Sequence, residues 1–229
     1  MKNIIEIIPI LSDNYCYWVV CPKTRKAALI DCPDAAPALE ILKKSGWDFA
    51  AILNTHHHWD HIGGNEALLR YKKVPVCGPQ LKEGDKIQIG ELVAQVLEVP
   101  GHTLDHVAFY FPALKALFCG DTLFVGGCGR LLEGTAEQMF ASLTKIKELS
   151  DDTLIYCGHE YSLKNLEFAL TIEPNNQALQ KKVAQAQAKR ARGEPTIPST
   201  LAEEKSYNPF LRAKDPNELA HRRKLKDDF

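Results

Sequence analysis

The sequence predicts an α/β protein with a smaller helical region at its C-terminal end. Over the first two thirds, short apolar runs alternate with segments of helical periodicity, which is typical of sheets covered by helices. After about residue 160 the strand patterns stop and helical patterns continue. We therefore expect an α/β body at residues 1–165 and a smaller helical domain at residues 166–229.

Individual elements follow from local patterns in chain order. Apolar runs rich in β-branched and aromatic residues predict strands, at residues 4–8, 16–20, 27–30, 51–53, 74–76, 92–99, 107–111, 116–119 and 153–156. Apolar residues spaced three or four apart predict helices, at residues 36–44, 65–70, 136–149, 163–172, 176–192 and 216–225. The segment "GEPTIPST" is interrupted by two prolines, so we expect an irregular link there.

Composition and charge indicate which partners and which compartment to expect. The chain is 45% hydrophobic and 25% charged, and its formal net charge is -1, which gives no support for a nucleic-acid or membrane partner. The apolar N-terminal run contains Glu6 and Pro9 and is predicted to be a strand, not a targeting segment. Seven cysteines without a C-x-x-C pair indicate reduced, buried thiols in a cytoplasmic protein.

The segment "THHHWDH" contains four of the eight histidines of the chain. His56 and His58 are two residues apart, so on an extended or turning backbone their side chains can converge on one point, with His57 facing away. Asp60 and His61 are adjacent, and a loop can direct them at a different target. Neutral imidazoles and carboxylates are ligands that zinc accepts. A solvated polar loop is the alternative, and the density of histidine disfavours it.

Three further candidate ligands lie at the ends of predicted strands. His102 follows the apolar run at 92–99, Asp121 follows the run at 116–119, and His159 follows the run at 153–156. Each is preceded by glycine, and functional residues of α/β proteins collect where a strand gives way to a loop. Together with the histidine cluster, these residues predict a metal site.

These motifs resemble the metallo-β-lactamase superfamily and, within it, the glyoxalase II or hydroxyacylglutathione hydrolase family. The similar motifs are "THHHWDH" at 55–61, "GHT" at 101–103, "GDT" at 120–122 and "GHEY" at 158–161. Similarity continues through "CGRLLEG", "CGHEYSLKNLEFAL", "EPTIPSTLAEEKSYNPFLR" and "KDDF", and so covers nearly the whole chain. The resemblance implies an αββα sandwich, the metallo-β-lactamase fold, with its site at one edge and a C-terminal helical domain that completes the substrate site.

The resemblance also implies a set of metal ligands. One ion would be held by His56, His58 and His102. A second ion would be held by Asp60, His61 and His159, with Asp121 bridging the two. Two divalent metal ions are therefore expected, zinc in the first place, with iron or manganese as alternatives.

The implied reaction is the hydrolysis of S-D-lactoylglutathione to glutathione and D-lactate, a step of methylglyoxal detoxification. A hydroxide shared by the two ions would attack the thioester, with Asp60 orienting it as a catalytic residue. Family matching implies contacts to glutathione from Arg130, Tyr161, Asn165, Arg223 and Lys226. On composition alone, the basic tail would be a solvated helix end. We expect a monomer whose partner is a small-molecule thioester.

Two positions depart from the family pattern. Leu132 stands where tyrosine is frequent, which affects substrate affinity more than chemistry. Asp105 stands where glycine is usual, and we expect a solvated turn residue there or a partner of His102. His106 is expected to be structural or to support the ligands, since the ligand set is complete without it.

Two other kinds of function are compatible with parts of the sequence. One is a related enzyme of the same fold, such as a persulfide dioxygenase with one iron or a lactamase-like hydrolase. The other is a non-catalytic binding protein. A full second ligand set argues against the dioxygenase, and the C-terminal helices with the basic tail argue against a lactamase. A binding protein would be expected to have lost ligands, and none is lost.

Overall fold

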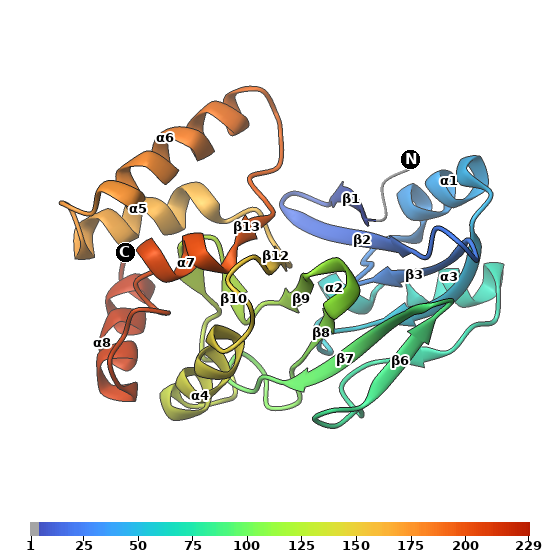
Figure 1. Cartoon of the computed structure of the whole chain (residues 1–229), viewed down its shortest axis with the longest axis horizontal. Helices are drawn as coiled ribbons and strands as arrows, with labels where there is room; N and C mark the ends of the chain where they lie inside the picture. Colours follow the sequence, from blue (N-terminus) through green and yellow to red (C-terminus); the bar gives the residue numbers. More distant parts are fainter. Residues whose placement is uncertain (1–4) are drawn as a thin grey trace.

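The computed structural model describes residues 5–229, and two β-sheets packed face to face form its centre (Figure 1). The first sheet has the strand order β1–β2–β3–β4–β5, at Ile5–Ile10, Asn14–Val20, Lys26–Ile30, Asp48–Leu53 and Val76–Cys77. The second has the order β13–β12–β9–β8–β7–β6, at Ser199–Thr200, Leu154–Cys157, Ala116–Gly120, Val107–Phe111, Leu92–Glu98 and Lys86–Ile89. A two-stranded hairpin lies beyond them, with β10 at Leu123–Phe124 and β11 at Gly127–Cys128.

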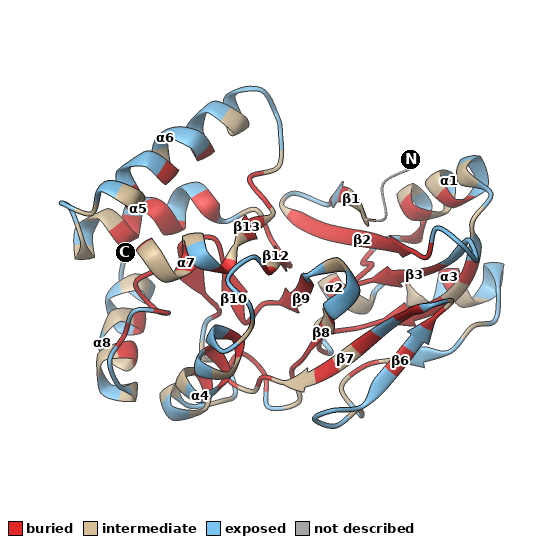
Figure 2. Ribbon diagram, in the orientation of Figure 1, coloured by how far each residue is buried: buried red, intermediate tan, exposed pale blue. Residues whose placement is uncertain are grey.

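Strand β2 shows how the core is divided. All seven of its residues are buried, because alternate side chains face two different hydrophobic clusters (Figure 2). Tyr17 faces the second sheet, where its ring lies 5.2 Å from Phe118 and 5.6 Å from Tyr156. Trp18 faces outward and packs edge-on against Phe49. The two sheets therefore share one core, and a second core lies under the helices of the first sheet.

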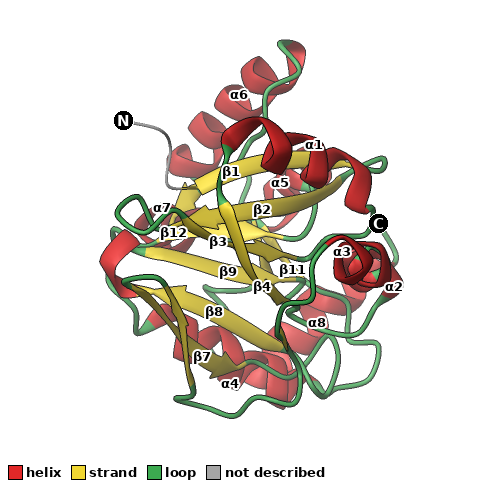
Figure 3. Ribbon diagram, turned by 90° about the vertical axis from the view of Figure 1, so that its right-hand side faces the viewer, coloured by secondary structure: helices red, strands yellow, loops and turns green. Residues whose placement is uncertain are grey.

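Helices cover the outer face of each sheet (Figure 3). Helix α1 (Ala35–Ser45) begins at the cap Asp34, accepts a hydrogen bond from the indole of Trp18 and so covers the first sheet together with α3 (Asn65–Tyr71). Helix α4 (Ala136–Lys147) begins with a capping box and packs its apolar face against the second sheet. Two short helical turns complete the body: α2 at Trp59–Ile62 and the 3-10 turn η1 at Pro112–Leu114.

The C-terminal region consists mainly of helices but is joined to the second sheet. It contains α5 (Ser162–Ile172), α6 (Gln177–Ala191), α7 (Leu201–Tyr207) and α8 (Pro216–Asp227), on the left of Figure 1. Strand β13 pairs antiparallel with β12 and so adds this region to the edge of the sheet. The helical region is therefore anchored to the body through backbone hydrogen bonds as well as side chains.

Most expected elements are present within one to three residues of their expected bounds. The strand expected at 4–8 is found as β1, and its first residue lies outside the described part of the chain. Several elements were not predicted from the sequence. They are short, namely α2, η1, α7, β10, β11 and β13, or polar on one face, as in β6. The cysteines are free, and all are buried except the half-buried Cys77. No helix in the described residues is long and apolar enough to span a membrane.

A buried carboxylate connects α7 to the hairpin of the body. Glu204 is fully buried and accepts hydrogen bonds from the backbone N–H of Gly126 (3.0 Å), the hydroxyl of Tyr207 (2.6 Å) and the amide of Asn208 (2.9 Å). Asn208 also donates to the carbonyl of Phe124. Burial raises the pKa of Glu204.

We expect Glu204→Ala to lower the free energy of unfolding by about 2–4 kcal/mol, because it leaves several buried donors without an acceptor. Urea unfolding measures this change, and the exposed Glu167→Ala on α5 is the matched control, with an expected effect within about 0.5 kcal/mol. Equal unfolding midpoints for the two variants would contradict the anchoring role of Glu204.

Candidate functional site

The candidate ligands meet at one edge of the two sheets because parallel strands end there. Strands β9 and β12 are parallel, so Asp121 and His159, which follow them, lie on the same side. Strands β3 and β4 are also parallel, and His56 follows β4. His102 enters from the loop after β7. The side chains that the sequence placed at strand ends therefore do lie close together in the structure.

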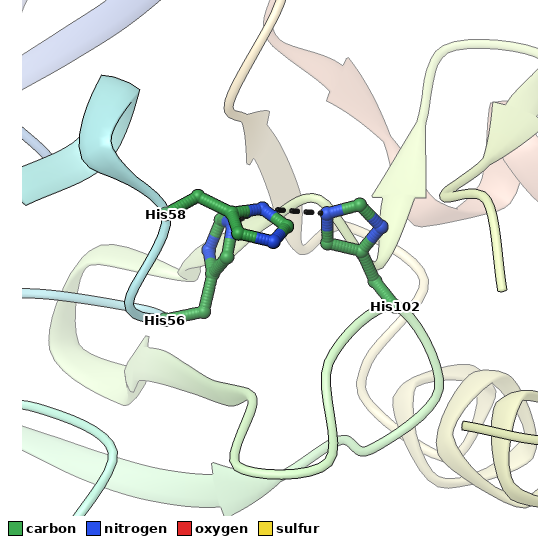
Figure 4. Close-up of side chains that lie close together, drawn as sticks. All are labelled: His56, His58 and His102. Atoms are coloured by element: carbon green, nitrogen blue, oxygen red, sulfur yellow. Dashed lines mark hydrogen bonds between the residues drawn. The ribbon is translucent and has the colours of Figure 1, made fainter. Parts of the chain in front are cut away.

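His56, His58 and His102 form a first cluster, in which the three imidazoles converge (Figure 4). Nε2 of His56 lies 2.9 Å from Nδ1 of His58, which lies 3.2 Å from Nε2 of His102. Burial lowers the pKa of His56 well below its ordinary value and also lowers the pKa of His58. The imidazoles of His56 and His58 are therefore held neutral, with lone pairs available to a metal ion.

Asp60, His61 and His159 form a second cluster beside the first. Oδ2 of Asp60 lies 3.4 Å from Nε2 of His159 and 3.7 Å from Nε2 of His61. The contact with His159 keeps the pKa of Asp60 well below its usual range, so the carboxylate is ionised. This cluster offers two imidazoles and one carboxylate to a cation.

Asp121 lies between the two clusters. Its Oδ2 is 3.5 Å from Nε2 of His102 and 3.3 Å from Nε2 of His159, and its Oδ1 is 3.5 Å from Nε2 of His61. The side chain is buried, and the backbone N–H of Asp121 donates to Nε2 of His106. One carboxylate therefore faces ligands of both clusters, which is the position that a bridging ligand needs.

The residues present fit a pair of metal ions. Nε2 of His61 and Oδ1 of Asp121 are buried and have no hydrogen-bond partner among the described residues. Buried polar atoms without partners cost free energy, and a cation between them would remove that cost. Although burial alone would lower it, the contacts with Asp121 and Asp60 raise the pKa of His159 to about 11. The same negative surroundings favour a bound cation, and the histidine and aspartate donors suit zinc.

Asp31 is a supporting residue that the sequence analysis missed. It follows β3, is buried, and accepts hydrogen bonds from the backbone N–H (2.8 Å) and hydroxyl (2.7 Å) of Thr55. Its Oδ2 also lies 3.2 Å from Nδ1 of His61, and the hydroxyl of Thr55 lies 3.0 Å from Nδ1 of His56. A carboxylate at a strand end was the signal that identified Asp121, and the same signal could have identified Asp31.

Asp13, at the end of the connection between β1 and β2, and Asn14, the first residue of β2, support the second cluster. Oδ1 of Asp13 lies 2.8 Å from Nδ1 of His159, and the amide of Asn14 donates to Oδ2 of Asp60 at 3.1 Å. Ligating histidines commonly present their second nitrogen to a carboxylate, which fixes the ring and the tautomer. No sequence pattern near residue 13 indicates this role.

His57 points away from both clusters, as its place between His56 and His58 suggests. Its Nδ1 lies 3.0 Å from both carboxylate oxygens of Asp105. Asp105 is thus a partner of His57, where we expected a solvated turn residue or a partner of His102. His106 is buried and stacks on His56 with 4.6 Å between ring centroids, which agrees with a supporting role.

A cleft of about 390 Å³ opens beside the clusters, between the hairpin and helices α5 and α8. His102 and Asp121 form part of its wall, together with all five residues that sequence matching proposed for glutathione, Arg130, Tyr161, Asn165, Arg223 and Lys226. The ring of Tyr161 stacks flat on His159, with 4.6 Å between centroids. Leu132 is 59% exposed.

The side chains proposed to contact glutathione differ in how far other protein groups already engage them. Arg223 is buried and already bonded to the carbonyl of Cys128 (2.9 Å) and the carboxylate of Asp227 (3.0 Å). Lys226 donates to one backbone carbonyl and otherwise lies over aromatic rings, while Arg130 is exposed. Asn165 is buried, and its Nδ2 has no partner among the described residues.

Fold and site together define the class of protein. A sequence profile of the metallo-beta-lactamase superfamily matches residues 11–86 and 74–159. Among solved structures, ETHE1 from Myxococcus xanthus is similar with a TM-score of 0.75 and 27% identity, over 97% of this chain and 90% of that one. TTHA1623, solved in a di-iron-bound form, has a TM-score of 0.66 and 25% identity, over 90% of this chain and 99% of that one. The chain has the metallo-β-lactamase fold.

The C-terminal region identifies the family within that class. Residues 160–229 match the profile described as the hydroxyacylglutathione hydrolase C-terminus. A hydroxyacylglutathione hydrolase of Rhodopseudomonas palustris (strain BisB5) is 48% identical over 94% of this chain and 89% of its own length. That of Rhodospirillum rubrum is 45% identical over 98% and 97%. The chain belongs to the hydroxyacylglutathione hydrolase family, which confirms the resemblance found in its motifs.

The geometry assigns different roles to the adjacent histidines His57 and His58. We expect His58→Ala to lower the metal content of the purified protein below two ions per chain, because Nδ1 of His58 lies at the centre of the first cluster. His57→Ala should leave two ions in place, since neither of its nitrogens faces the clusters. Elemental analysis of both variants measures this, and an equal loss of metal in both would refute the distinction.

Proposed function

We propose that the protein hydrolyses glutathione thioesters, with S-D-lactoylglutathione as the substrate and glutathione and D-lactate as products, in methylglyoxal detoxification. The observation that supports this most strongly is the cationic cleft that opens onto a complete double cluster of histidine and aspartate. Relatives named hydroxyacylglutathione hydrolase match almost the whole chain. A lactamase-like function would leave the cleft between the hairpin and α8 unexplained, and a non-catalytic binding protein would leave the complete set of histidine and aspartate ligands unexplained.

We assign the ligand roles on the geometry of the clusters. His56, His58 and His102 would hold one ion, Asp60, His61 and His159 the other, and Asp121 would bridge them. We propose zinc as the metal, because nitrogen and carboxylate donors suit it. Iron and manganese accept the same donors.

The chemistry divides between the metal ions and the side chains. When bound, two metal ions lower the pKa of water to roughly 7 and polarise a carbonyl. Asp60, ionised and held by the amide of Asn14, would accept a hydrogen bond from the attacking water and aim its oxygen at the thioester carbon. The leaving group is a thiolate with an ordinary pKa of about 8.5, so the protein needs no dedicated general acid.

The cleft offers charges and donors that match glutathione, which has two carboxylates. Lys226 and Arg130 would meet a carboxylate directly, because neither is fully engaged by a protein acid. Arg223 would contribute its charge while it holds Asp227 and the carbonyl of Cys128. The unpartnered amide of Asn165 and the hydroxyl of Tyr161 would donate to the peptide part of the substrate.

The remaining proposals concern the whole molecule. We propose that residues 166–229 form the substrate-binding domain, because Arg223 and Lys226 reach the cleft from α8. The free state of the cysteines supports a cytoplasmic protein. We also propose that it acts as a monomer, since the ligands and the cleft come from one chain.

The direct test is hydrolysis of S-D-lactoylglutathione by the metal-loaded protein, followed through release of the free thiol. We expect turnover that Asp60→Asn reduces by at least about 100-fold, since this variant loses a ligand and the group that orients water. Oxygen consumption with a glutathione persulfide serves as the comparison. Absence of thioester turnover at two ions per chain, or oxygen consumption in its place, would refute the proposed reaction.

A second prediction concerns the pH dependence of substrate capture. Burial, followed by the charge of Arg223, lowers the pKa of Lys226 to about 8. Lys226 is therefore positive below pH 8 and loses its charge above it, so kcat/KM should fall by up to about tenfold per pH unit above 8.

Lys226→Arg should remove that decline, because an arginine stays charged. The exposed Lys224→Ala on the same helix is the control and should keep the wild-type profile. If Lys226→Arg shows the same decline as the wild type, Lys226 is not the group that titrates.

A further inference from the structure

His57 lies on the outer side of the first cluster between two carboxylates. Its side chain is 48% exposed. Nδ1 lies 3.0 Å from both oxygens of Asp105, and Nε2 lies 3.3 Å from Oε1 of Glu133. We call His57, Asp105 and Glu133 the outer cluster. The proposed reaction uses none of these three residues.

The outer cluster repeats the surroundings of an inner ligand. His159 has one carboxylate, Asp13, 2.8 Å from its Nδ1 and a second, Asp121, 3.3 Å from its Nε2. In His57 the corresponding distances are 3.0 Å to Asp105 and 3.3 Å to Glu133. A histidine that binds metal commonly donates its second N–H to a carboxylate, as Nδ1 of His57 is placed to do with Asp105.

The contacts of His57 with Asp105 and with Glu133 differ in kind. The contact of Nδ1 with Asp105 has the length of a hydrogen bond in which the ring donates. With Nδ1 donating to Asp105, the second nitrogen, Nε2, lies 3.3 Å from Oε1 of Glu133, and these two atoms could both bind one metal ion. Two ligands of a tetrahedral zinc ion, each about 2.0–2.1 Å from the metal, are roughly 3.3 Å apart. The spacing therefore suits a shared ion.

Glu133 is held in place for such a role. Its Oε2 accepts a hydrogen bond from the backbone N–H of Leu104 at 2.9 Å, and its own N–H donates to the carbonyl of His102 at 3.3 Å. The free oxygen, Oε1, is the one that faces His57. A potential donor atom of His58 also lies within 4.8 Å of those of His57 and Glu133.

We infer that His57 and Glu133 form an accessory site for a divalent cation of the zinc type, with Asp105 as the residue that positions His57. The ion would be held by few protein ligands and by water, because the half-exposed side chains leave room for solvent. Its affinity is therefore lower than that of the inner clusters, and it fills after them. An ion here would tie the loop of His56 and His58 to the loop of Glu133, which is itself hydrogen-bonded to the loop of His102.

The experiment is equilibrium dialysis of the full chain against free zinc from the micromolar to the millimolar range, with zinc per chain counted by elemental analysis. The wild type should bind a third ion after the first two. His57→Gln and Glu133→Gln should each stop at two. Asp105→Asn should bind the third ion about 10- to 100-fold more weakly, the cost of losing a carboxylate behind a ligating histidine.

His221→Gln is the matched control, because His221 is an exposed histidine on α8, distant from the outer cluster in sequence, and the variant should keep the third ion. A wild type that saturates at two ions throughout the zinc range would overturn the inference. So would a third ion that persists in both His57→Gln and Glu133→Gln. The count at low zinc reports separately on the inner clusters, so the two proposals fail independently.

Discussion

A single buried carboxylate organises the site. Asp121 faces imidazole nitrogens that come from three separate loops, those of His61, His102 and His159, at 3.3 to 3.5 Å. The backbone around it leaves no space for other side chains. Gly158 comes so close that a Cβ there would lie 2.3 Å from Oδ1 of Asp121, and Gly120 has φ +47° and would meet the hydroxyl of Thr55 at the same distance. The glycines before Asp121 and His159 are therefore steric requirements of the site.

The two sheets bring these loops to one edge and hold them there. Behind the inner residues, Asp13 and Asp31 contact the outer nitrogens of His159 and His61, and Asn14 holds Asp60. These residues are positioned by β2 and β3, the strands on which the shared core is built. The packing of the core therefore determines how the cluster residues are oriented, because a shift of β2 would move Asn14 and, through its hydrogen bond, Asp60.

The sequence indicated which residues gather in the two inner clusters, and the order of most elements, because both depend on local patterns. Spacing within "THHHWDH" separated His57 from its neighbours, and apolar runs marked the strands that end at Asp121 and His159. The supporting residues depend on contacts distant in sequence: 146 residues separate Asp13 from His159. Strand β13 has only two residues, and it forms because β12 offers a free edge. The engagement of Arg223 with Asp227, four residues later, was also invisible, since composition indicated only a charged tail.

The central claim is that Asp121 joins two metal ions into one site. Anomalous diffraction at the zinc absorption edge, on crystals of the zinc-loaded protein, tests this most directly. The account predicts two anomalous peaks roughly 3.5–4 Å apart, one beside His56, His58 and His102 and the other beside Asp60, His61 and His159, with the carboxylate of Asp121 bound to both. A single peak, or two peaks of which only one contacts Asp121, would contradict it.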